Sequence, residues 1–518
     1  MALVRDITTV GGGTLASRLL AYLRDAWIAA LLGAGPHSEA FFAVLQVVNF
    51  FRRLLSEGAL NSAFVPIWHK LRAGEDGLAN ADRFTRRVLL TMFCIGGILA
   101  LLIVYFAPAV IAIIAPGFDR ERRSLAAFLL FMVAPYVVLA GLVAVIAAAL
   151  SAEGRIRAVA ISTVLFNLIM VVVLALVVLP HSGIGEFYTT AWLAFAVSIA
   201  GLMQLMVTAT VWLSTGKRLQ HAHTYVPGQT ETFFKRVLPG LIAAGIPQLK
   251  LIAATAIASA SPAAVSWLYY ANRLYELPLG VASVAIATVI VPRIAATIHA
   301  GDKTALTAAQ SRAYEVAFGL TLPAAAGFAL LADQISSGLF EHGAFGPQDT
   351  VAVASALTAI CAGLPGHVLE KVFGAVSFAH EDTHTPMLAA LIGLATAIVG
   401  GLLLFPHFGH VGVAGAIAIS GWVGAILLNF VLWRRGWLSV DSQARRRLPR
   451  IALVTVIMAI VVACASYALA PSGNASAASR LVILAVLVAL GITVYFSLLQ
   501  LFGVVKLKEL AKAVRHGT

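Results

Sequence analysis

The sequence has 518 residues, of which 60% are hydrophobic and only 11% are charged, and its mean hydropathy is +0.92. Soluble domains are less apolar and carry about twice that fraction of charged residues. A water-soluble fold could not cover so much apolar surface, so we expect a polytopic membrane protein. The net charge of +13 does not indicate nucleic-acid binding, because the basic residues lie in short loops between apolar runs.

Apolar runs long enough to cross a bilayer recur along the whole chain. A hydrocarbon core of about 30 Å requires roughly 20 helical residues. The sequence therefore predicts an all-α protein with about fourteen transmembrane helices. The runs lie near residues 7–31, 39–66, 88–115, 125–150, 158–180, 190–213, 235–260, 264–292, 313–340, 350–376, 386–405, 410–433, 451–470 and 480–503.

The Lys and Arg residues are distributed unequally between the two sides of the predicted membrane. If the N-terminus is cytoplasmic, the segments on that side hold 26 of the 36 basic residues. The loops on the opposite side hold four, which are Arg120, Arg122, Arg123 and Arg480. By the positive-inside rule, both termini are expected to face the cytoplasm.

An internal repeat relates the two halves of the chain. A shift of 226 residues lays Val65 and Pro66 on Val291 and Pro292, and Gly117 on Gly343. Each half would hold six helices with the same orientation, a plan that transporters use for alternating access around a central site. We therefore predict an N-terminal lobe, a C-terminal lobe, two additional helices and a cytoplasmic tail, at residues 1–215, 234–435, 449–505 and 506–518.

Six basic residues lie inside the hydrophobic runs, where a charge costs roughly 2.5–3.5 kcal/mol and normally faces a partner or a hydrated cavity. They are Arg18, Arg24, Arg52, Arg53, Lys250 and Arg273. The acids nearby are Asp25, Glu39, Glu57 and Glu276. Two positive charges remain in excess, which predicts an anionic substrate.

The spacing and type of these cations suggest distinct roles. Arg53 stands four residues before Glu57, and Arg273 three before Glu276, so each pair can meet on one helix face. A guanidinium offers a fork of donors that fits phosphate oxygens. We expect Arg18, Arg24, Arg52 and Arg273 to converge on a diphosphate, and Arg53 to be structural. Lys250 remains open between substrate contact and structural pairing.

Several of these residues belong to longer motifs that resemble the MurJ (MviN) lipid II flippases. The first motif runs through Ser17-Arg18, Arg24-Asp25, Gly33-Ala34-Gly35, Ala40-Phe41-Phe42, Asn49, Arg52-Arg53, Glu57-Gly58-Ala59 and Ala63-Phe64-Val65-Pro66. The second-lobe segment from Val265 through Ser266 and Asn272 to Leu274 resembles that family as well. So do residues 339–343 and Thr385-Pro386, and the resemblance covers nearly the whole chain.

The resemblance implies the multidrug/oligosaccharidyl-lipid/polysaccharide (MOP) exporter fold and a function. That function is to flip undecaprenyl-diphosphate-linked peptidoglycan precursor from the cytoplasmic to the periplasmic leaflet. Arg18, Arg24, Asp25, Arg52 and Arg273 match positions at which the family needs its charge. The implied partners are lipid II, membrane lipids and, as an open expectation, the cell-wall synthesis machinery. The last two helices would border a groove for the lipid tail.

The sequence departs from the family pattern at three of these positions. Glu39 replaces the usual Asp, Asn272 stands where relatives often have Asp, and Lys250 occupies a normally uncharged position. Some relatives bind sodium through carboxylates in helices 7 and 11. Residues 237–260 and 386–405 contain no Asp or Glu, so a sodium site is unsupported and the membrane potential is the expected driving force.

Other interpretations were weighed against the flippase. The spacing of His380 and His384 suits a metal ligand pair, but a solvated turn is the favoured interpretation and no metal site is expected. No Walker A motif or other cofactor signature is present. A related polysaccharide-lipid or drug exporter, or an enzyme acting on polyprenyl-linked sugars, remains the alternative. An enzyme would need acid/base groups in sizeable outer loops.

Overall fold

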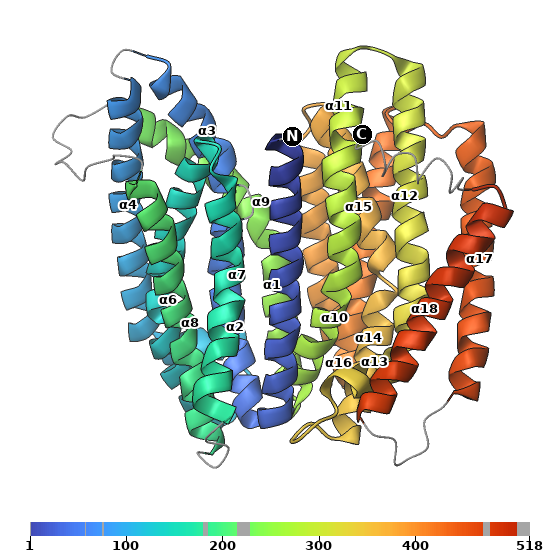
Figure 1. The fold of residues 1–518 in the computed structure, drawn as a ribbon, viewed down its shortest axis with the longest axis horizontal. Helices are drawn as coiled ribbons and strands as arrows, with labels where there is room; N and C mark the ends of the chain where they lie inside the picture. The colour runs from blue at the N-terminus through green and yellow to red at the C-terminus, as the bar shows by residue number, and fades with distance from the viewer. Residues whose placement is uncertain are drawn as a thin grey trace. The chain divides into compact units, whose positions relative to one another are not determined.

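The computed structural model describes residues 2–56, 59–74, 77–179, 185–214, 228–469 and 477–504. These residues form helices joined by short turns, and no strand occurs among them (Figure 1). The prediction of an all-α protein is therefore confirmed for the described part of the chain. The chain divides into two compact units, residues 1–266 and 267–518.

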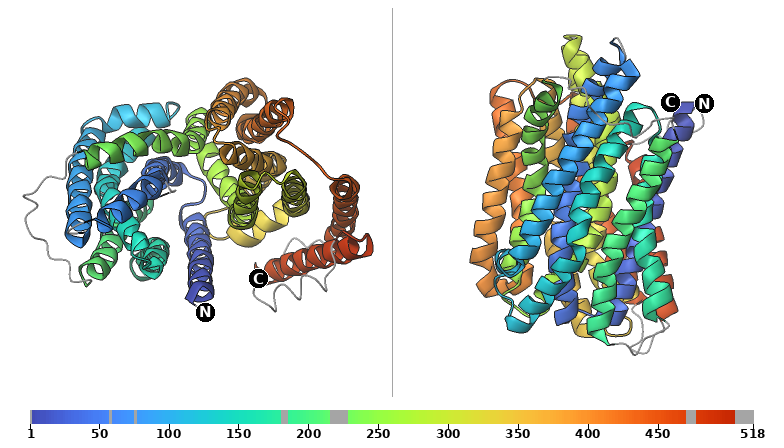
Figure 2. Two further views of the ribbon diagram at one scale, coloured as in Figure 1. Left: turned by 90° about the horizontal axis from the view of Figure 1, so that it is seen from above. Right: turned by 90° about the vertical axis from the view of Figure 1, so that its left-hand side faces the viewer.

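Unit 1 contains nine α-helices and a short π-helical segment within its described residues, and the long helices run side by side (Figure 2). They are α1 (Ala2–Leu32), α2 (Pro36–Ser56), α3 (Ala59–Arg72), α4 (Gly77–Tyr105), α5 (Ala107–Ile114), α6 (Arg120–Ala152), α7 (Ile156–Val173), η1 (Leu174–Val178), α8 (Glu186–Leu213) and α9 (Gln229–Ala258). Gly33 has φ +57°, a left-handed conformation that ends α1, and α2 then begins at Pro36, whose fixed φ suits the first helical position.

Most of α10 belongs to unit 2, although the helix begins in the last residues of unit 1. Its described elements are α10 (Ala264–Ala285), η3 (Ile286–Ile290), α11 (Val291–His299), α12 (Lys303–Leu330), α13 (Ala332–Phe340), α14 (Pro347–Cys361), α15 (Leu364–Ala379), α16 (His384–Arg434), α17 (Ser442–Ala468) and α18 (Ala477–Leu501). The pair α17 and α18 stands at the edge of this unit and packs on α12 and α13. The structure divides the chain by packing alone, so the predicted repeat and lobe boundaries stay predictions.

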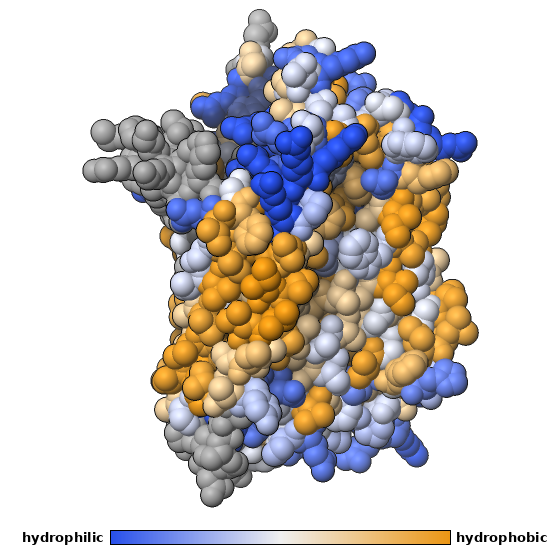
Figure 3. Space-filling view, turned by 90° about the vertical axis from the view of Figure 1, so that its right-hand side faces the viewer, coloured by the Kyte–Doolittle hydropathy of each residue, from blue (hydrophilic) through white to orange (hydrophobic). Residues whose placement is uncertain are grey.

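Ten helices in the described part are long and apolar enough to cross a membrane. One of them, α16, contains a sharp kink at Gly409 (φ +56°, ψ −138°), which separates the two runs predicted near 386–405 and 410–433. Helices α1, α2 and α9 are not among these ten, and the described residues of α9 include a shorter apolar stretch, Gly245–Ala258. The total of about fourteen spans stays a prediction. On the face in Figure 3, hydrophobic side chains form a broad area with hydrophilic side chains gathered at both ends.

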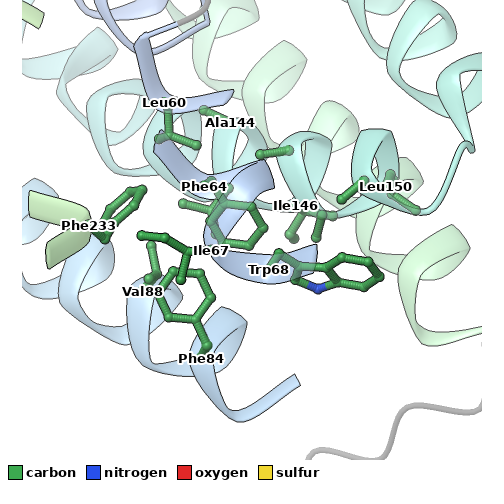
Figure 4. Close-up of a cluster of buried hydrophobic side chains, with 14 of the residues drawn as sticks. Leu60, Phe64, Ile67, Trp68, Phe84, Val88, Ala144, Ile146, Leu150 and Phe233 are labelled. Carbon is green, nitrogen blue, oxygen red and sulfur yellow. The ribbon is translucent and has the colours of Figure 1, made fainter. Parts of the chain in front are cut away.

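The core of unit 1 is built around aromatic side chains from three helices. Phe64, Phe84 and Phe233 are buried, and their ring centroids lie 5.1–6.1 Å apart. Trp68 is fully buried beside them (Figure 4). Such ring pairs add to the packing of α3 against α4 and α9, which positions the neighbouring helix α2.

The core of unit 2 depends on close contact between α15 and α16. A Cβ atom on Gly363 would lie 2.4 Å from the Cα of Ala418, and one on Gly366 would lie 2.8 Å from the backbone nitrogen of Trp422. Only glycine permits these approaches. Small residues on both helices therefore allow the close contact.

Candidate functional site

The first site residues lie together on α1. Arg24 is 4% exposed and Asp25 is fully buried. Arg24 donates from Nε and Nη2 to Oδ1 of Asp25, at 2.8 and 2.6 Å. Both charges are removed from water within an apolar bundle, and each offsets part of the other's desolvation cost.

Asn167 of α7 completes the environment of this pair, and the sequence analysis did not single it out. Its Oδ1 accepts a hydrogen bond from Arg24 Nη1 at 3.0 Å. Its Nδ2 donates to the backbone oxygen and the Oγ of Ser17, at 3.1 and 3.0 Å. The signal in the sequence was an amide side chain in an otherwise apolar span, which usually marks a contact between helices.

Arg52 of α2 contacts the residue that precedes Asn167. Its Nη2 donates to Oδ1 of Asn49 at 3.1 Å, and its Cζ lies 5.5 Å from the ring centroid of Phe166. Consecutive residues of α7 therefore contact two of the predicted substrate arginines, which come from different helices. This arrangement holds both guanidinium groups in fixed directions within unit 1.

For the other three predicted intramembrane cations of unit 1, the structure gives the helix and the burial. Arg18 and Arg53 are half-buried on α1 and α2, and Lys250 is buried on α9. Glu57 lies outside the described residues, so the predicted pairing of Arg53 with Glu57 stays a prediction.

Glu39 does not share a described contact with these arginines. It is 1% exposed and accepts a 2.8 Å hydrogen bond from Nη1 of Arg122, which also donates to Asp119 at 3.0 Å. The sequence analysis placed Arg122 in a loop, whereas Asp119 caps α6 and brings Arg122 into its first turn. Because Glu39 already balances Arg122, it contributes less to neutralising Arg24 and Arg52 than its sequence position suggested.

Ser266 lies near Glu39, at the start of α10. Its Oγ is 3.0 Å from the Oγ of Ser38, whose hydroxyl donates to the backbone oxygen of Gly35. The backbone N–H of Val265 donates to Glu39 Oε1 at 3.3 Å. These bonds attach the turn before α10 to the start of α2, so Ser266 has a structural contact here.

In unit 2, Arg273 and Glu276 meet on one face of α10 as predicted, with Nη1 and Oε2 3.4 Å apart. Asn272 is half-buried on the same helix. The hydroxyl of Tyr275 lies 2.9 Å from Nδ1 of His367 on α15, a polar contact that the sequence analysis missed. The predicted convergence of arginines from both lobes on one diphosphate stays a prediction.

The segment with the histidine pair has other contacts. Asp382 accepts hydrogen bonds from the backbone and hydroxyl of Thr385 and from Arg435, and the His380 ring stacks on Trp437 with centroids 4.1 Å apart. In the part of the chain that the structure describes, no three His, Cys, Asp or Glu side chains are grouped to hold a metal.

Comparison with solved structures defines the class of protein. A lipid II flippase MurJ in an inward closed conformation superposes with a TM-score of 0.78 at 23% identity, covering 95% of this chain and 98% of that one. An inward-facing MATE family transporter of the MOP superfamily superposes with a TM-score of 0.68 at 16% identity, covering 84% and 95%. The chain has the fold shared by these two transporters.

Sequence comparison identifies the family of the chain. The family model described as "Lipid II flippase MurJ" matches residues 28–503. A probable lipid II flippase MurJ of Rhizobium meliloti (strain 1021) is 36% identical over 100% of this chain and 97% of the relative. One from Rhizobium tropici is 33% identical over 97% and 95%. The chain belongs to the MurJ family.

Proposed function

We propose that this protein is a lipid II flippase, which moves the undecaprenyl-diphosphate-linked peptidoglycan precursor from the cytoplasmic to the periplasmic leaflet of the bacterial inner membrane. The family match over residues 28–503 carries this proposal. The buried arginines agree with it, because a transported diphosphate needs cationic donors within the span. Alternating access is the mode of transport in this proposal.

The geometry of unit 1 suggests how a diphosphate would be engaged. Asp25 and Asn167 occupy donors on Arg24 and hold its guanidinium plane. Arg52 is held by Asn49 and Phe166. Groups fixed in advance lose little conformational entropy on binding, so small displacements of Asp25 or Asn49 would release donors to phosphate oxygens. Arg18 and Arg273 are proposed as further contacts.

Complementation tests this proposal. In cells depleted of their own flippase, the parent protein is expected to restore growth, and Arg24→Ala and Arg52→Ala to lose that rescue. Arg24→Lys retains the charge but not the fork of donors, so it is expected to rescue poorly. Arg446→Ala, on the exposed first turn of α17, is the control with the same loss of charge. Normal growth with both Arg24→Ala and Arg52→Ala at parental protein levels would contradict the headgroup role.

A polysaccharide-lipid exporter of the same superfamily is the second candidate. The excess of positive charge inside the span suits either lipid-linked diphosphate, but it argues against a drug/cation antiporter. Peptidoglycan synthesis in a strain with this protein as its only flippase distinguishes the two. Failure there, with export of another lipid-linked saccharide, would favour the second candidate.

Orientation and partners form part of the proposal. The excess of Lys and Arg at one end of the spans supports cytoplasmic termini. Alkaline phosphatase fused at the C-terminus is expected to be inactive, and active when fused after Arg120 on the opposite side. Lipid II and membrane lipids are the proposed ligands, and contact with the cell-wall synthesis machinery would appear as co-purification with its enzymes.

A further inference from the structure

A groove in unit 2 lies away from the residues discussed so far. It has a volume of about 540 Å³ and is lined by side chains of α12, α15, α16, the turn before α17 and the start of α17. None of the predicted substrate residues lines it. The proposed headgroup contacts therefore do not account for this groove, and α18, the second helix of the expected lipid-tail groove, does not line it.

Most of the groove wall is apolar and opens toward the surface. Phe318, Phe373 and Ile426 line it, together with Trp422 and Trp433. Ile426 is 63% exposed and Trp433 is 67% exposed, although both belong to the membrane-spanning helix α16. Apolar side chains exposed on a span face lipid, and tryptophan favours the interface between hydrocarbon and headgroups. The wall therefore suits an acyl chain that enters from the bilayer.

One end of the groove is basic. Arg445 of α17 lines it, and its side chain is exposed and forms no ion pair or hydrogen bond with the described residues. Arg447, two positions later, is bound instead by Glu315 of α12 at 3.2 Å. Asp441 is occupied as the cap of α17, where it accepts from the backbone of Ala444. Glu315 and Asp441 thus have other described partners, and the guanidinium of Arg445 stays available at the groove.

Two further polar groups lie at the groove. Asn429 lines it from α16, exposed and with no side-chain hydrogen bond among the described residues. Ser439 lines it from the turn before α17, and its hydroxyl donates to Gln310 at 3.1 Å while its oxygen can still accept. An arginine flanked by an amide and a hydroxyl matches the oxygen-rich headgroup of a phospholipid.

We propose that this groove binds an anionic phospholipid of the surrounding membrane. Its phosphate would contact Arg445, and one acyl chain would lie along Phe318, Phe373 and Ile426. A zwitterionic lipid would bring a cationic group toward Arg445 and the other arginines of α17, whereas a phosphatidylglycerol brings only negative charge. The bound lipid would connect α17 to α12 and α16, in addition to the Arg447–Glu315 ion pair.

Quenching of tryptophan fluorescence by brominated lipid tests the proposal on the full-length protein. Vesicles of dioleoylphosphatidylcholine would contain increasing dibrominated phosphatidylglycerol, or dibrominated phosphatidylcholine for comparison. Trp422 and Trp433 line the groove, so bound brominated lipid quenches them. We expect phosphatidylglycerol to be preferred over phosphatidylcholine several-fold, and the strongly quenched fraction to fall in Trp433→Phe.

The variants distinguish a specific lipid-binding site from general attraction of anionic lipid to a basic surface. Arg445→Ala is expected to bring the ratio of phosphatidylglycerol to phosphatidylcholine binding close to one. Arg446→Ala removes the same charge beside the groove and is expected to leave this ratio unchanged. Ile426→Phe narrows the groove while keeping Arg445 and adds no tryptophan, and it is expected to weaken quenching by phosphatidylglycerol as well. Equal loss in the Arg445 and Arg446 variants, or a parental preference in Arg445→Ala, would overturn the proposal.

Discussion

Asn167 and its neighbour Phe166 contact two of the predicted substrate arginines of unit 1, Arg24 and Arg52. Arg24 has Asp25 on one side and Asn167 on the other, so the direction of its guanidinium depends on both. A site for a diphosphate needs its donors held in a set geometry. Asn167 is therefore a positioning residue in the proposed flippase.

Asn167→Ala tests this role. The amide of Asn167 provides an acceptor for Arg24 and a donor for Ser17. Its removal is expected to lower the free energy of unfolding by about 1–3 kcal/mol. We expect growth rescue at least ten-fold weaker than the parent, together with a lower melting temperature in detergent. Gln500→Ala, at an exposed position near the end of α18, serves as the control for loss of an amide. Full rescue by Asn167→Ala would remove the positioning role.

At the scale of the elements, the approach of α15 to α16 depends on a glycine. Because a Cβ on Gly363 would lie 2.4 Å from the backbone of Ala418, an alanine there must push the two helices apart. Gly363→Ala is expected to lower the melting temperature by several degrees. Gly415→Ala is the matched control on α16, because a Cβ there meets no atom within 4 Å. Equal melting temperatures for the two variants would refute this view of the packing.

The turn between α15 and α16 gives a prediction about pH. Burial would raise the pKa of Asp382, but hydrogen bonds from Thr385 and Arg435 outweigh it and lower this pKa to about 2, from 3.8. A lowered folded-state pKa adds stability above about pH 4, and this contribution is lost as the pH falls toward 2.

We therefore expect Asp382→Asn to melt below the parent at pH 7, and the difference to shrink as the pH falls from about 4 toward 2. Melting curves of detergent-solubilised protein across that range provide the measurement. Glu381→Gln, at the neighbouring position, controls for loss of a carboxylate. A difference between Asp382→Asn and the parent that is constant with pH would contradict the argument.

At the scale of the whole molecule, the driving force remains to be tested. The membrane potential supplies about 2.3 kcal/mol per charge per 100 mV, and the substrate is anionic in the proposed function. Neither 237–260 nor 386–405 offers a carboxylate for sodium. Valinomycin with external potassium is expected to stop lipid II export in cells that rely on this protein, whereas removal of sodium is expected to leave it unchanged. The opposite pair of results would favour a sodium-coupled cycle.

Composition and the distribution of apolar runs determined the all-helical membrane class, and the motifs around Arg24 and Arg52 indicated the family. These properties are local, because the length of an apolar run and the spacing of residues on one helix can be read from the chain itself. The same reasoning predicted the Arg273–Glu276 contact, whose partners lie one turn apart.

Contacts between distant segments were decided by tertiary structure. The bond between Arg24 and Asn167, the pairing of Arg122 with Glu39 and the groove at Arg445 depend on which helices pack together. Helical periodicity carries no information about a partner on a distant helix.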